Sequence, residues 1–543
     1  MRRPWARSSR CCAGVPARED SDSDLYDPAT ALPFLAMPFL GLPLLACPSE
    51  TAVLPDTLRE AAHRFGDSVA YVAPRDWPLT YADLDRVTDE VAAGLATRGV
   101  REGDVVGLVL PPGVEYLACY VALAKLGAIT AGVNDRLAAR ERAAVLAVAG
   151  PELVIAAPGY DGDHEVIEVT TADALAELLP HLREPDGTPP PLADDPDRDV
   201  AIIFTSGTTG TPRGALYGNR QLRFITDTDV GGNWGMGGRG LMGTSCSTLG
   251  FMTKLPGNLR RGATTFMMER WSAHAALELT ARERMTSSGG VPTQVALMLR
   301  DRDFDSFDLS CVKSILFGGG PLTPSLAQEA RERFRAPVAT RYSCTEAGLG
   351  LGTALDADEE DAVVSVGHPL PGVELVLLDP EDRAVPTGEV GSVCLRSAAA
   401  MTGYWRDPEA TRAAFTADGF VRTGDLGWID DRGRLRLVGR AKEMYVRGGY
   451  NVYPVEVEAV LANAPGVAAI AIAPRTDDLM GEIGVACVVP RDRAHPPTLD
   501  DLRAYAADLL AHHKLPEAIA IVDALPLTAA EKVDRRALAR LAD

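Results

Sequence analysis

The stretch from Phe204 to Gly214, FTSGTTGTPRG, constrains the fold of this chain more than any other segment. It follows an apolar run, residues 199–203, which predicts a buried strand. Glycines let a backbone bend closely around a ligand, and hydroxyls and free N–H groups can bind the oxygens of an anion. Clusters of serine, threonine and glycine are often ordinary polar loops, and this spacing is not that of a Walker loop. The length and order of the cluster nevertheless predict a phosphate-binding loop directly after a strand.

Four further regions support this interpretation. They are residues 341–346 (RYSCTE), residues 403–405 with 422–425 (GYW and RTGD), residues 439–458 (from GRAKE to VEVE) and residues 526–535 (PLTAAEKVDR). Together with the loop, and in the same order, they resemble the motifs of the acyl-adenylate-forming superfamily. That superfamily includes acyl-CoA synthetases, the adenylation domains of peptide synthetases and luciferases. The resemblance covers the chain from about residue 51 to the end and is strongest to AMP-forming acyl-CoA synthetases.

The resemblance implies an α/β protein with a large N-terminal domain, residues 51–438, made of α/β subdomains and a small β-rich lobe. It also implies a smaller, mobile C-terminal α+β domain, residues 439–543. The sequence agrees, because amphipathic helical segments alternate with short apolar strands through the first part of the chain. A loop rich in glycine, arginine and lysine begins near Gly439. At 543 residues the chain is also too long for one ordinary core.

The composition of the chain limits the classes of partner that it is expected to bind. The net charge of -21 and the pI of about 4.9 argue against nucleic acid and anionic membranes, which would be repelled. The nine cysteines are dispersed without a C-x-x-C pair, which indicates reduced thiols in a cytoplasmic protein and no zinc site. The expected partners are therefore small molecules.

The first fifty residues carry an apolar run, residues 32–47, that mimics the end of a secretion signal. Acidic residues precede the run where positive charge belongs, and Pro33, Pro38 and Pro43 interrupt any helix. The run is also too short to span a bilayer. Residues 1–50 are therefore interpreted as a loose extension with no transmembrane segment, or as the product of a start codon placed too early.

The resemblance also implies a set of nucleotide contacts. ATP or AMP would be bound by Thr205, Ser206, Gly207, Thr208, Thr209, Gly210, Arg213, Gly319, Gly320, Pro321, Tyr342, Asp425 and Arg440. Arg213 departs from the family, which usually has lysine there, and a guanidinium is a rigid fork rather than a point charge.

Three residues are implied to be catalytic: Thr345 at the α-phosphate, Glu346 as a ligand of Mg²⁺, and Lys532 between the acid and the α-phosphate. Thr205 is a second candidate metal ligand. Mg²⁺ prefers oxygen ligands, which both residues supply. Lys442 corresponds to the hinge of the family, and Gly448 and Gly449 to the tunnel that admits the pantetheine arm of CoA.

The acid pocket is the least specified part. Residues 244–252 contain no carboxylate to pair with an α-ammonium, and an unpaired buried ammonium is costly, so an α-amino acid is disfavoured. Trp234, Phe251 and Met252 are candidates for an apolar wall, although such residues are more often part of a core.

Three functions fit these motifs. The first is an acid–CoA ligase that uses ATP and Mg²⁺, and the second is an adenylating enzyme that loads a phosphopantetheine carrier protein. The third, a non-catalytic nucleotide-binding relative, is supported only by Arg213 and by Glu531, which stands where the family usually has glycine. Thioester formation with CoA or with a carrier protein distinguishes the first two.

The composition of the extension generates a first prediction. Deletion of the residues up to Cys47 is expected to leave soluble, active enzyme, because the deleted segment carries none of the motifs. Activity and sedimentation of the shortened and full-length proteins test this. Loss of folding on deletion, or recovery of the full-length protein in the membrane fraction, would contradict it.

Overall fold

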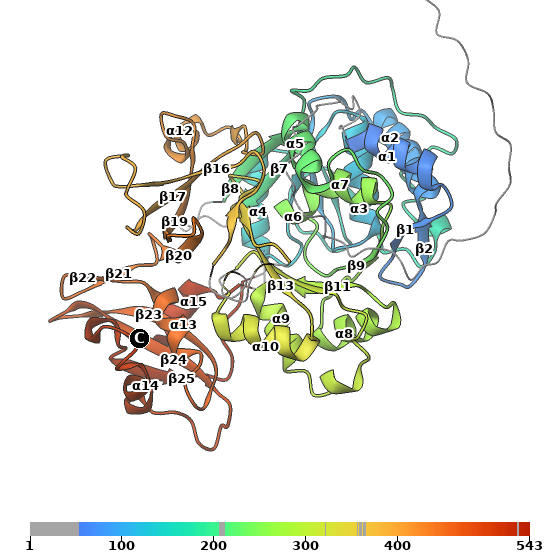
Figure 1. Cartoon of the computed structure of the whole chain (residues 1–543). Coiled ribbons are helices and arrows are strands. Elements are labelled where there is room, and N and C mark those ends of the chain that lie inside the picture. Colours follow the sequence, from blue (N-terminus) through green and yellow to red (C-terminus); the bar gives the residue numbers. More distant parts are fainter. Residues whose placement is uncertain are drawn as a thin grey trace, which may run out of the picture.

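The computed structural model describes residues 54–205, 212–320, 322–355, 357, 361, 365–528 and 532–542. It is a mixed α/β structure in which two α/β layers, a β-rich lobe and a C-terminal α+β unit follow one another along the chain (Figure 1). This is the predicted fold class. None of the helices in the described part of the chain is both long and apolar enough to cross a membrane.

A seven-stranded sheet carries the predicted phosphate loop. Its order is β18-β8-β7-β4-β3-β5-β6, and β3 (Val105–Val109), β4 (Ile129–Gly132), β5 (Leu153–Ala156), β6 (Val166–Glu168) and β7 (Asp199–Thr205) are parallel. Two strands, β8 (Arg213–Gly218) and β18 (Gly403–Tyr404), add antiparallel pairs at one edge. The strands β7 and β8 pair Thr205 with Arg213, so the two ends of the predicted loop lie opposite each other.

Helices from the same part of the chain pack on this sheet or on one another beside it. They are α1 (Leu54–Phe65), α2 (Tyr81–Thr97), α3 (Val114–Lys125), α4 (Ala139–Ala149), α5 (Asn219–Val230), α6 (Leu249–Met252) and α7 (Leu255–Arg261). Every residue of α3 is buried, which explains why apolar residues occupy all positions between Glu115 and Lys125. Its buried Lys125 is paired with α2, because Nζ lies 2.6 Å from a carboxylate oxygen of Asp85 and 2.6 Å from one of Asp89.

A smaller sheet lies beside these helices in the order β2-β1-β10-β9. Its strands are β1 (Val69–Val72), β2 (Pro78–Thr80), β9 (Arg239–Met242) and β10 (Thr264–Met267).

The second α/β layer has the strand order β11-β12-β13-β14-β15. Its strands are β11 (Ser287–Gly290), β12 (Ser314–Gly318), β13 (Val338–Tyr342), β14 (Leu351–Gly352) and β15 (His368–Pro369). Three helices, α8 (Ala273–Arg282), α9 (Pro292–Leu299) and α10 (Pro324–Phe334), pack on one face through a common core that includes Leu277, Val295, Ile315 and Phe317. The opposite face turns toward the first layer.

The β-rich lobe is an antiparallel sheet of β16 (Glu374–Leu378), β17 (Gly391–Arg396), β19 (Val421–Ile429) and β20 (Leu435–Arg440), with α12 (Pro408–Ala414) beside it. Because β20 continues through Gly439 and Arg440, the loop that predicted a boundary at Gly439 begins after Arg440. The register explains the extension, since Arg440 is the strand partner of Asp425.

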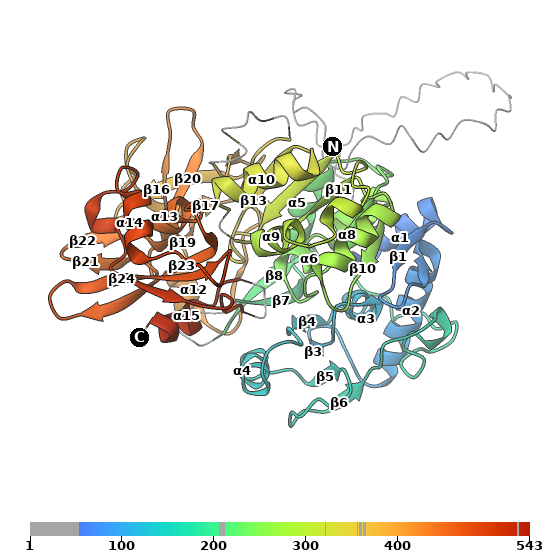
Figure 2. The same ribbon diagram turned by 90° about the horizontal axis from the view of Figure 1, so that it is seen from below.

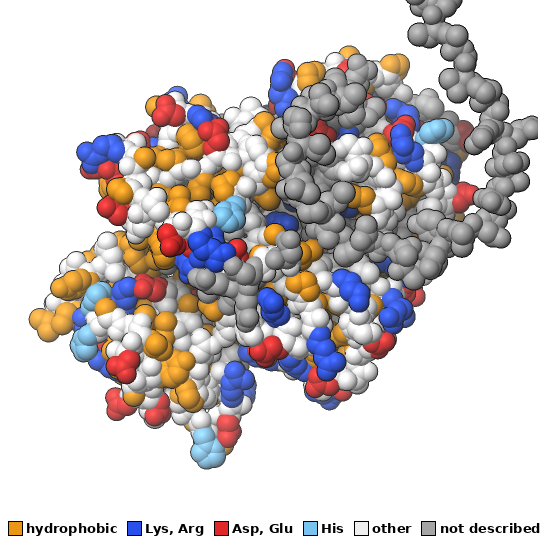
Figure 3. Space-filling model, viewed as in Figure 1, with side chains coloured by type: hydrophobic (Ala, Val, Ile, Leu, Met, Phe, Trp, Pro, Cys, Tyr) orange, Lys and Arg blue, Asp and Glu red, His pale blue; other side chains and the backbone are white. Residues whose placement is uncertain are grey.

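The C-terminal unit has its own core around a sheet of β21 (Tyr445–Arg447), β22 (Tyr450–Val452), β23 (Val467–Asp477), β24 (Gly481–Pro490) and β25 (Ala518–Ile521). The helices are α13 (Pro454–Leu461), α14 (Leu499–Ala506) and α15 (Arg535–Ala542). The unit lies beside the lobe and α9–α10 (Figures 1 and 2). One hydrogen bond across this contact runs from Arg300 Nη2 to the carbonyl of Ala468, at 3.2 Å. On the face drawn in Figure 3, acidic and basic side chains of the described residues are interspersed.

One glycine in α2 shows how tightly the first layer is packed. A Cβ at Gly94 would lie 1.9 Å from the carbonyl oxygen of Leu182, a backbone atom that cannot move aside easily. Gly94→Ala is therefore expected to lower the urea midpoint of unfolding, with a loss of about 1–3 kcal/mol, although alanine is the better helix former. Gly250→Ala in α6 is the matched control, because no atom lies within 4 Å of its Cβ position. Equal midpoints for the two variants would contradict this account.

Candidate functional site

The predicted nucleotide residues Tyr342, Asp425 and Arg440 meet where three strands end or bend. Tyr342 closes β13, while Asp425 and Arg440 are partners across β19 and β20. The hydroxyl of Tyr342 donates to Asp425 Oδ2 at 2.7 Å, and Arg440 Nε donates to Asp425 Oδ1 at 3.0 Å. One buried carboxylate thus joins the second α/β layer to the β-rich lobe.

The surroundings of Tyr342 determine the protonation state of its phenol. Burial, and then the neighbouring carboxylate of Asp425, raise the pKa of Tyr342 well above its usual value. The phenol therefore keeps its proton and remains a hydrogen-bond donor. Charge-assisted bonds of this kind are shorter and stronger than neutral ones.

A second cluster gathers the other predicted phosphate and metal residues. The hydroxyl of Tyr404 donates to Glu346 Oε1 at 2.8 Å, and the guanidinium carbon of Arg213 lies 5.4 Å from the centre of the Tyr404 ring. Pairing of β18 with β8 places Tyr404 there, opposite Ala215. The Gly-Tyr-Trp motif at residues 403–405 did not by itself indicate a role for Tyr404, because the contact with Glu346 forms only in the folded chain.

Neighbouring backbone contacts hold this cluster. The fully buried Tyr217 of β8 donates its hydroxyl to the carbonyl of Thr345, which ties Thr345 to the seven-stranded sheet. Thr205 ends β7 opposite Arg213. The predicted residues Ser206, Gly207, Thr208, Thr209, Gly210 and Pro321 lie outside the described residues.

Lys532 reaches the same region from the C-terminal unit. A Cβ at Gly319, in the turn after β12, would lie 4.0 Å from Lys532 Cε, and Gly320 packs close to Pro292. Desolvation by the surrounding protein lowers the pKa of Lys532, and Arg440 lowers it further while Asp425 opposes the shift. The structure therefore brings Lys532 together with Gly319, Arg440 and Asp425, although the side chain keeps contact with solvent.

The predicted hinge and tunnel residues lie elsewhere on the C-terminal unit. Lys442 occupies the turn between β20 and β21, and Gly448 and Gly449 form the tip of the β21–β22 hairpin with φ of +55° and +87°. Such angles strain residues that carry a Cβ. Figures 1 and 2 both place this hairpin at the far side of the C-terminal unit from β13.

The three candidate acid-pocket residues have different surroundings. Trp234 packs against Phe65 with ring centres 6.3 Å apart, between two arginine side chains. Phe251 instead packs against Tyr116 and Tyr120, and Met252 is fully buried behind them. A single apolar wall made of all three stays a prediction.

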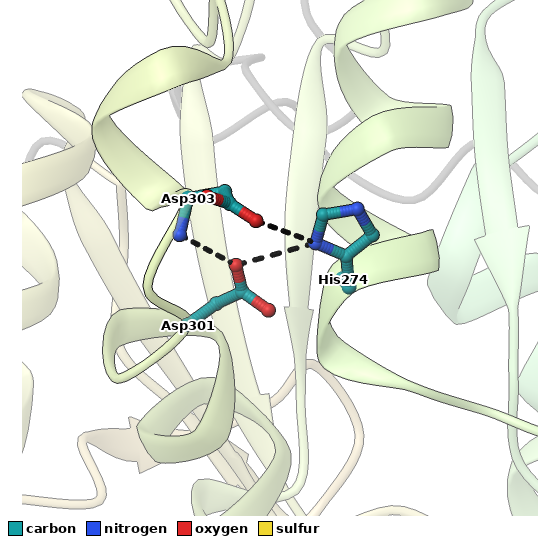
Figure 4. A group of neighbouring side chains, drawn as sticks. All are labelled: His274, Asp301 and Asp303. Carbon is teal, nitrogen blue, oxygen red and sulfur yellow. Dashed lines mark hydrogen bonds and ion pairs between the residues drawn. The ribbon is translucent and has the colours of Figure 1, made fainter.

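One group of ionisable side chains lies outside these clusters. His274, on the first turn of α8, has its Nδ1 3.4 Å from Asp301 Oδ1 and 3.7 Å from Asp303 Oδ2 (Figure 4). Asp301 also accepts the backbone N–H of Asp303 at 3.0 Å. That N–H and His274 lower the pKa of Asp301, as in a surface ion pair.

Comparison with known proteins identifies the family. Residues 58–405 match the sequence model of the AMP-binding enzyme family, and residues 456–532 match that of the AMP-binding enzyme C-terminal domain. The chain belongs to the AMP-binding enzyme family. A feruloyl-CoA synthase from Amycolatopsis sp is 33% identical over 84% of this chain and 92% of its own length. A fatty acid–[acyl-carrier-protein] ligase, ScoC of Streptomyces coeruleorubidus, is 30% identical over 85% and 91%.

Solved structures agree in fold. The amide bond synthetase McbA from Marinactinospora thermotolerans is similar over 90% of this chain and 99% of its own, with 28% identity and a TM-score of 0.79. ATP-bound MatB from Rhodopseudomonas palustris is similar over 90% and 98%, with 26% identity and a TM-score of 0.80. The family is thus one of ATP-dependent, AMP-forming ligases, and the relatives named here differ in the acceptor.

The two hydrogen bonds that Asp425 accepts, from Tyr342 and Arg440, lead to a prediction about nucleotide binding. Asp425→Asn removes the charge that orders Tyr342 and Arg440, and it is expected to weaken ATP binding by about 1.5–3 kcal/mol. Titration calorimetry with ATP measures the effect. Asp382→Asn is the control, because Asp382 also accepts a bidentate arginine, Arg422, but at the exposed surface. An unchanged ATP affinity in Asp425→Asn would contradict the assignment.

Proposed function

We propose that this protein is an acyl-CoA synthetase, which activates a carboxylic acid as acyl-AMP and then transfers the acyl group to the thiol of CoA. The observation that carries the proposal is the approach of Lys532 to the Gly319 turn, beside the Asp425–Arg440 pair. It brings a mobile cation from the C-terminal unit to the predicted nucleotide residues. Family membership and the names of the relatives support the same reaction class.

The first step would use the residues gathered in this state. An oxygen of the acid attacks the α-phosphorus of ATP, a new O–P bond forms, and the bond to pyrophosphate breaks. Hydroxide is a poor leaving group, so AMP takes its place for the second step. Negative charges converge at the α-phosphate, and preorganised donors are the strongest way to stabilise them. Lys532 and Thr345 would supply them, while Arg213 and the loop from Thr205 to Gly210 would hold the outer phosphates.

The residues around Glu346 fit a Mg²⁺ ion. The hydroxyl of Tyr404 donates a hydrogen bond to Oε1 of Glu346, and no described residue hydrogen-bonds Oε2. Thr205 is the last residue of β7, and its hydroxyl would supply a second oxygen ligand. A bound Mg²⁺ would neutralise phosphate charge there, and the role of the protein is to orient the carboxylate through Tyr404.

The second step needs the other side of the C-terminal unit. The thiol sulfur attacks the acyl carbonyl carbon, a C–S bond forms, the C–O bond to AMP breaks and the thiol proton passes to solvent. Gly448 and Gly449 would line the thiol tunnel, and the β21–β22 hairpin that carries them lies on the far side of the C-terminal unit from β13 (Figures 1 and 2). We propose that the C-terminal unit, which follows β20, turns about Lys442 between the steps.

One relative favours a second acceptor. ScoC is named as a ligase for an acyl carrier protein, so a carrier phosphopantetheine is the alternative to CoA. Both acceptors present the same thiol arm. Thioester formation with CoA alone, against a pantetheinylated carrier protein without CoA, decides between them.

The two positions of the C-terminal unit generate a prediction for the half-reactions. Lys532→Ala is expected to slow ATP–pyrophosphate exchange by roughly 10²–10³, because one preorganised donor is lost. It should spare thioester formation from supplied acyl-AMP, in which AMP is already the leaving group. Gly449→Leu should do the opposite, since a side chain there would fill the thiol tunnel.

Two further variants act as controls. Lys442→Pro should resemble Gly449→Leu, because proline restricts φ at the proposed hinge. Lys313→Ala removes a lysine whose ammonium contacts only an exposed turn, and it should leave both steps unchanged. If Lys532→Ala slows both steps equally, the proposed alternation is wrong.

A further inference from the structure

Arg341 is an unusual residue for the position it occupies. It precedes Tyr342 on β13, and its strand partners on the two sides are Gly318 of β12 and Gly352 of β14. A Cβ at Gly352 would lie 2.7 Å from Arg341 Nη1, so the arginine side chain extends across that glycine. A Cβ at Gly318 would meet only the carbonyl oxygen and Cβ of Arg341, at 3.4 and 3.9 Å. A long cation therefore lies between two positions without side chains.

The register of the sheet shows which way this cation faces. Side chains alternate along a strand, and Ile315, Phe317 and Val338 are buried against α8–α10. Gly318 and Arg341 belong to the opposite set, which faces the first α/β layer, and both keep partial exposure. This face therefore retains accessible surface beside the cation.

The hydrogen bonds of Arg341 leave its charge uncompensated. Nη1 donates to the carbonyls of Thr340 and Thr353, at 3.0 and 2.8 Å. No described carboxylate lies within ion-pair distance of its guanidinium. Burial lowers the pKa of Arg341, and only Asp229 on α5 opposes the shift. The carboxylate of Asp229 is itself taken by Lys254 Nζ, at 2.9 and 3.2 Å.

The surroundings add further positive charge. Arg261 on α7 donates Nη2 to the backbone carbonyl of Asp229 at 3.2 Å, so the cations of Lys254, Arg261 and Arg341 surround one carboxylate. A buried charge without a partner is costly. The guanidinium is also a fork that matches a carboxylate with two parallel hydrogen bonds.

Arg341 lies close to the turn at which the reacting carboxylate of the acid is expected to bind. Gly318 adjoins Arg341 in the sheet, and the next residue, Gly319, lies close to Lys532. An acid with one carboxylate at Lys532 can therefore extend along this turn and present its other end to Arg341.

We propose that Arg341 binds a second carboxylate on the substrate, so that the enzyme prefers a dicarboxylic acid. This inference rests on the proposed acid activation and names its substrate class. Arg341 would select the substrate through its distal end and take no part in the bond changes at the α-phosphate.

The test compares each dicarboxylic acid with its own monomethyl ester, which has the same chain and one charge fewer. ATP–pyrophosphate exchange is measured with straight-chain diacids from malonate to suberate and with terephthalate. The wild type is expected to show a kcat/KM about ten- to a hundredfold higher for at least one diacid than for its ester. Arg341→Gln should bring this ratio near one, chiefly by raising KM for the diacid.

Two control variants distinguish loss of carboxylate recognition from a general effect on the structure of the protein. Arg396→Gln removes an exposed arginine that makes a bidentate pair with Glu374, and it should leave the ratio unchanged. Arg341→Lys keeps the charge without the fork and should retain part of the preference. If Arg341→Gln does not fold, the ratios of the wild type and of Arg341→Lys still decide the question.

The results that would contradict the role of Arg341 differ from those that would contradict acid activation. A wild-type ratio at or below one for every pair, or an equal loss of both substrates in Arg341→Gln, overturns the assignment of Arg341 while acid activation stands. Exchange with none of these acids, nor with any fatty or aryl monocarboxylic acid, contradicts the proposed function itself and this inference with it.

Discussion

The carboxylate of Asp425 is the contact on which the candidate site depends. It accepts a phenol from β13 and a guanidinium from β20, so one buried anion joins the second α/β layer to the β-rich lobe. Arg440 lies directly before the turn that leads to the C-terminal unit, and Lys532 returns from that unit to the same place. The position of the unit and the electrostatics of the site are therefore linked through this group.

Buried hydrogen bonds also position the residues that are predicted to contact the phosphates. Tyr217 fixes the carbonyl of Thr345, Tyr404 orients Glu346, and the short strand β18 joins the edge of the seven-stranded sheet. Two tyrosines and one edge strand thus place groups that are distant in the sequence around the end of β7. Small displacements of reacting groups are costly in catalysis, so this packing is part of the proposed mechanism.

Charge has a different role on the two sides of the Gly318–Gly319 turn. On one side, Lys532 comes from the C-terminal unit, and in the proposed mechanism it leaves the site when that unit turns. On the other side, Arg341 is held by two carbonyls within the second layer. A movable cation suits a charge that develops during one step, and a fixed cation suits recognition of a group that stays constant.

The sequence by itself was enough to predict the family and the fold class, and it named candidate nucleotide residues, because short glycine-rich and charged motifs keep their order and spacing. Tyr342, Asp425 and Arg440 were each predicted from their motifs, and the structure brings them together. Only the tertiary structure decided which side chains meet: Tyr404 with Glu346, Trp234 with Phe65, and Arg341 between two glycines. These contacts depend on strand register and on the face that a residue occupies. Neither is encoded locally, since both follow from how distant strands pair and which apolar surfaces they bury.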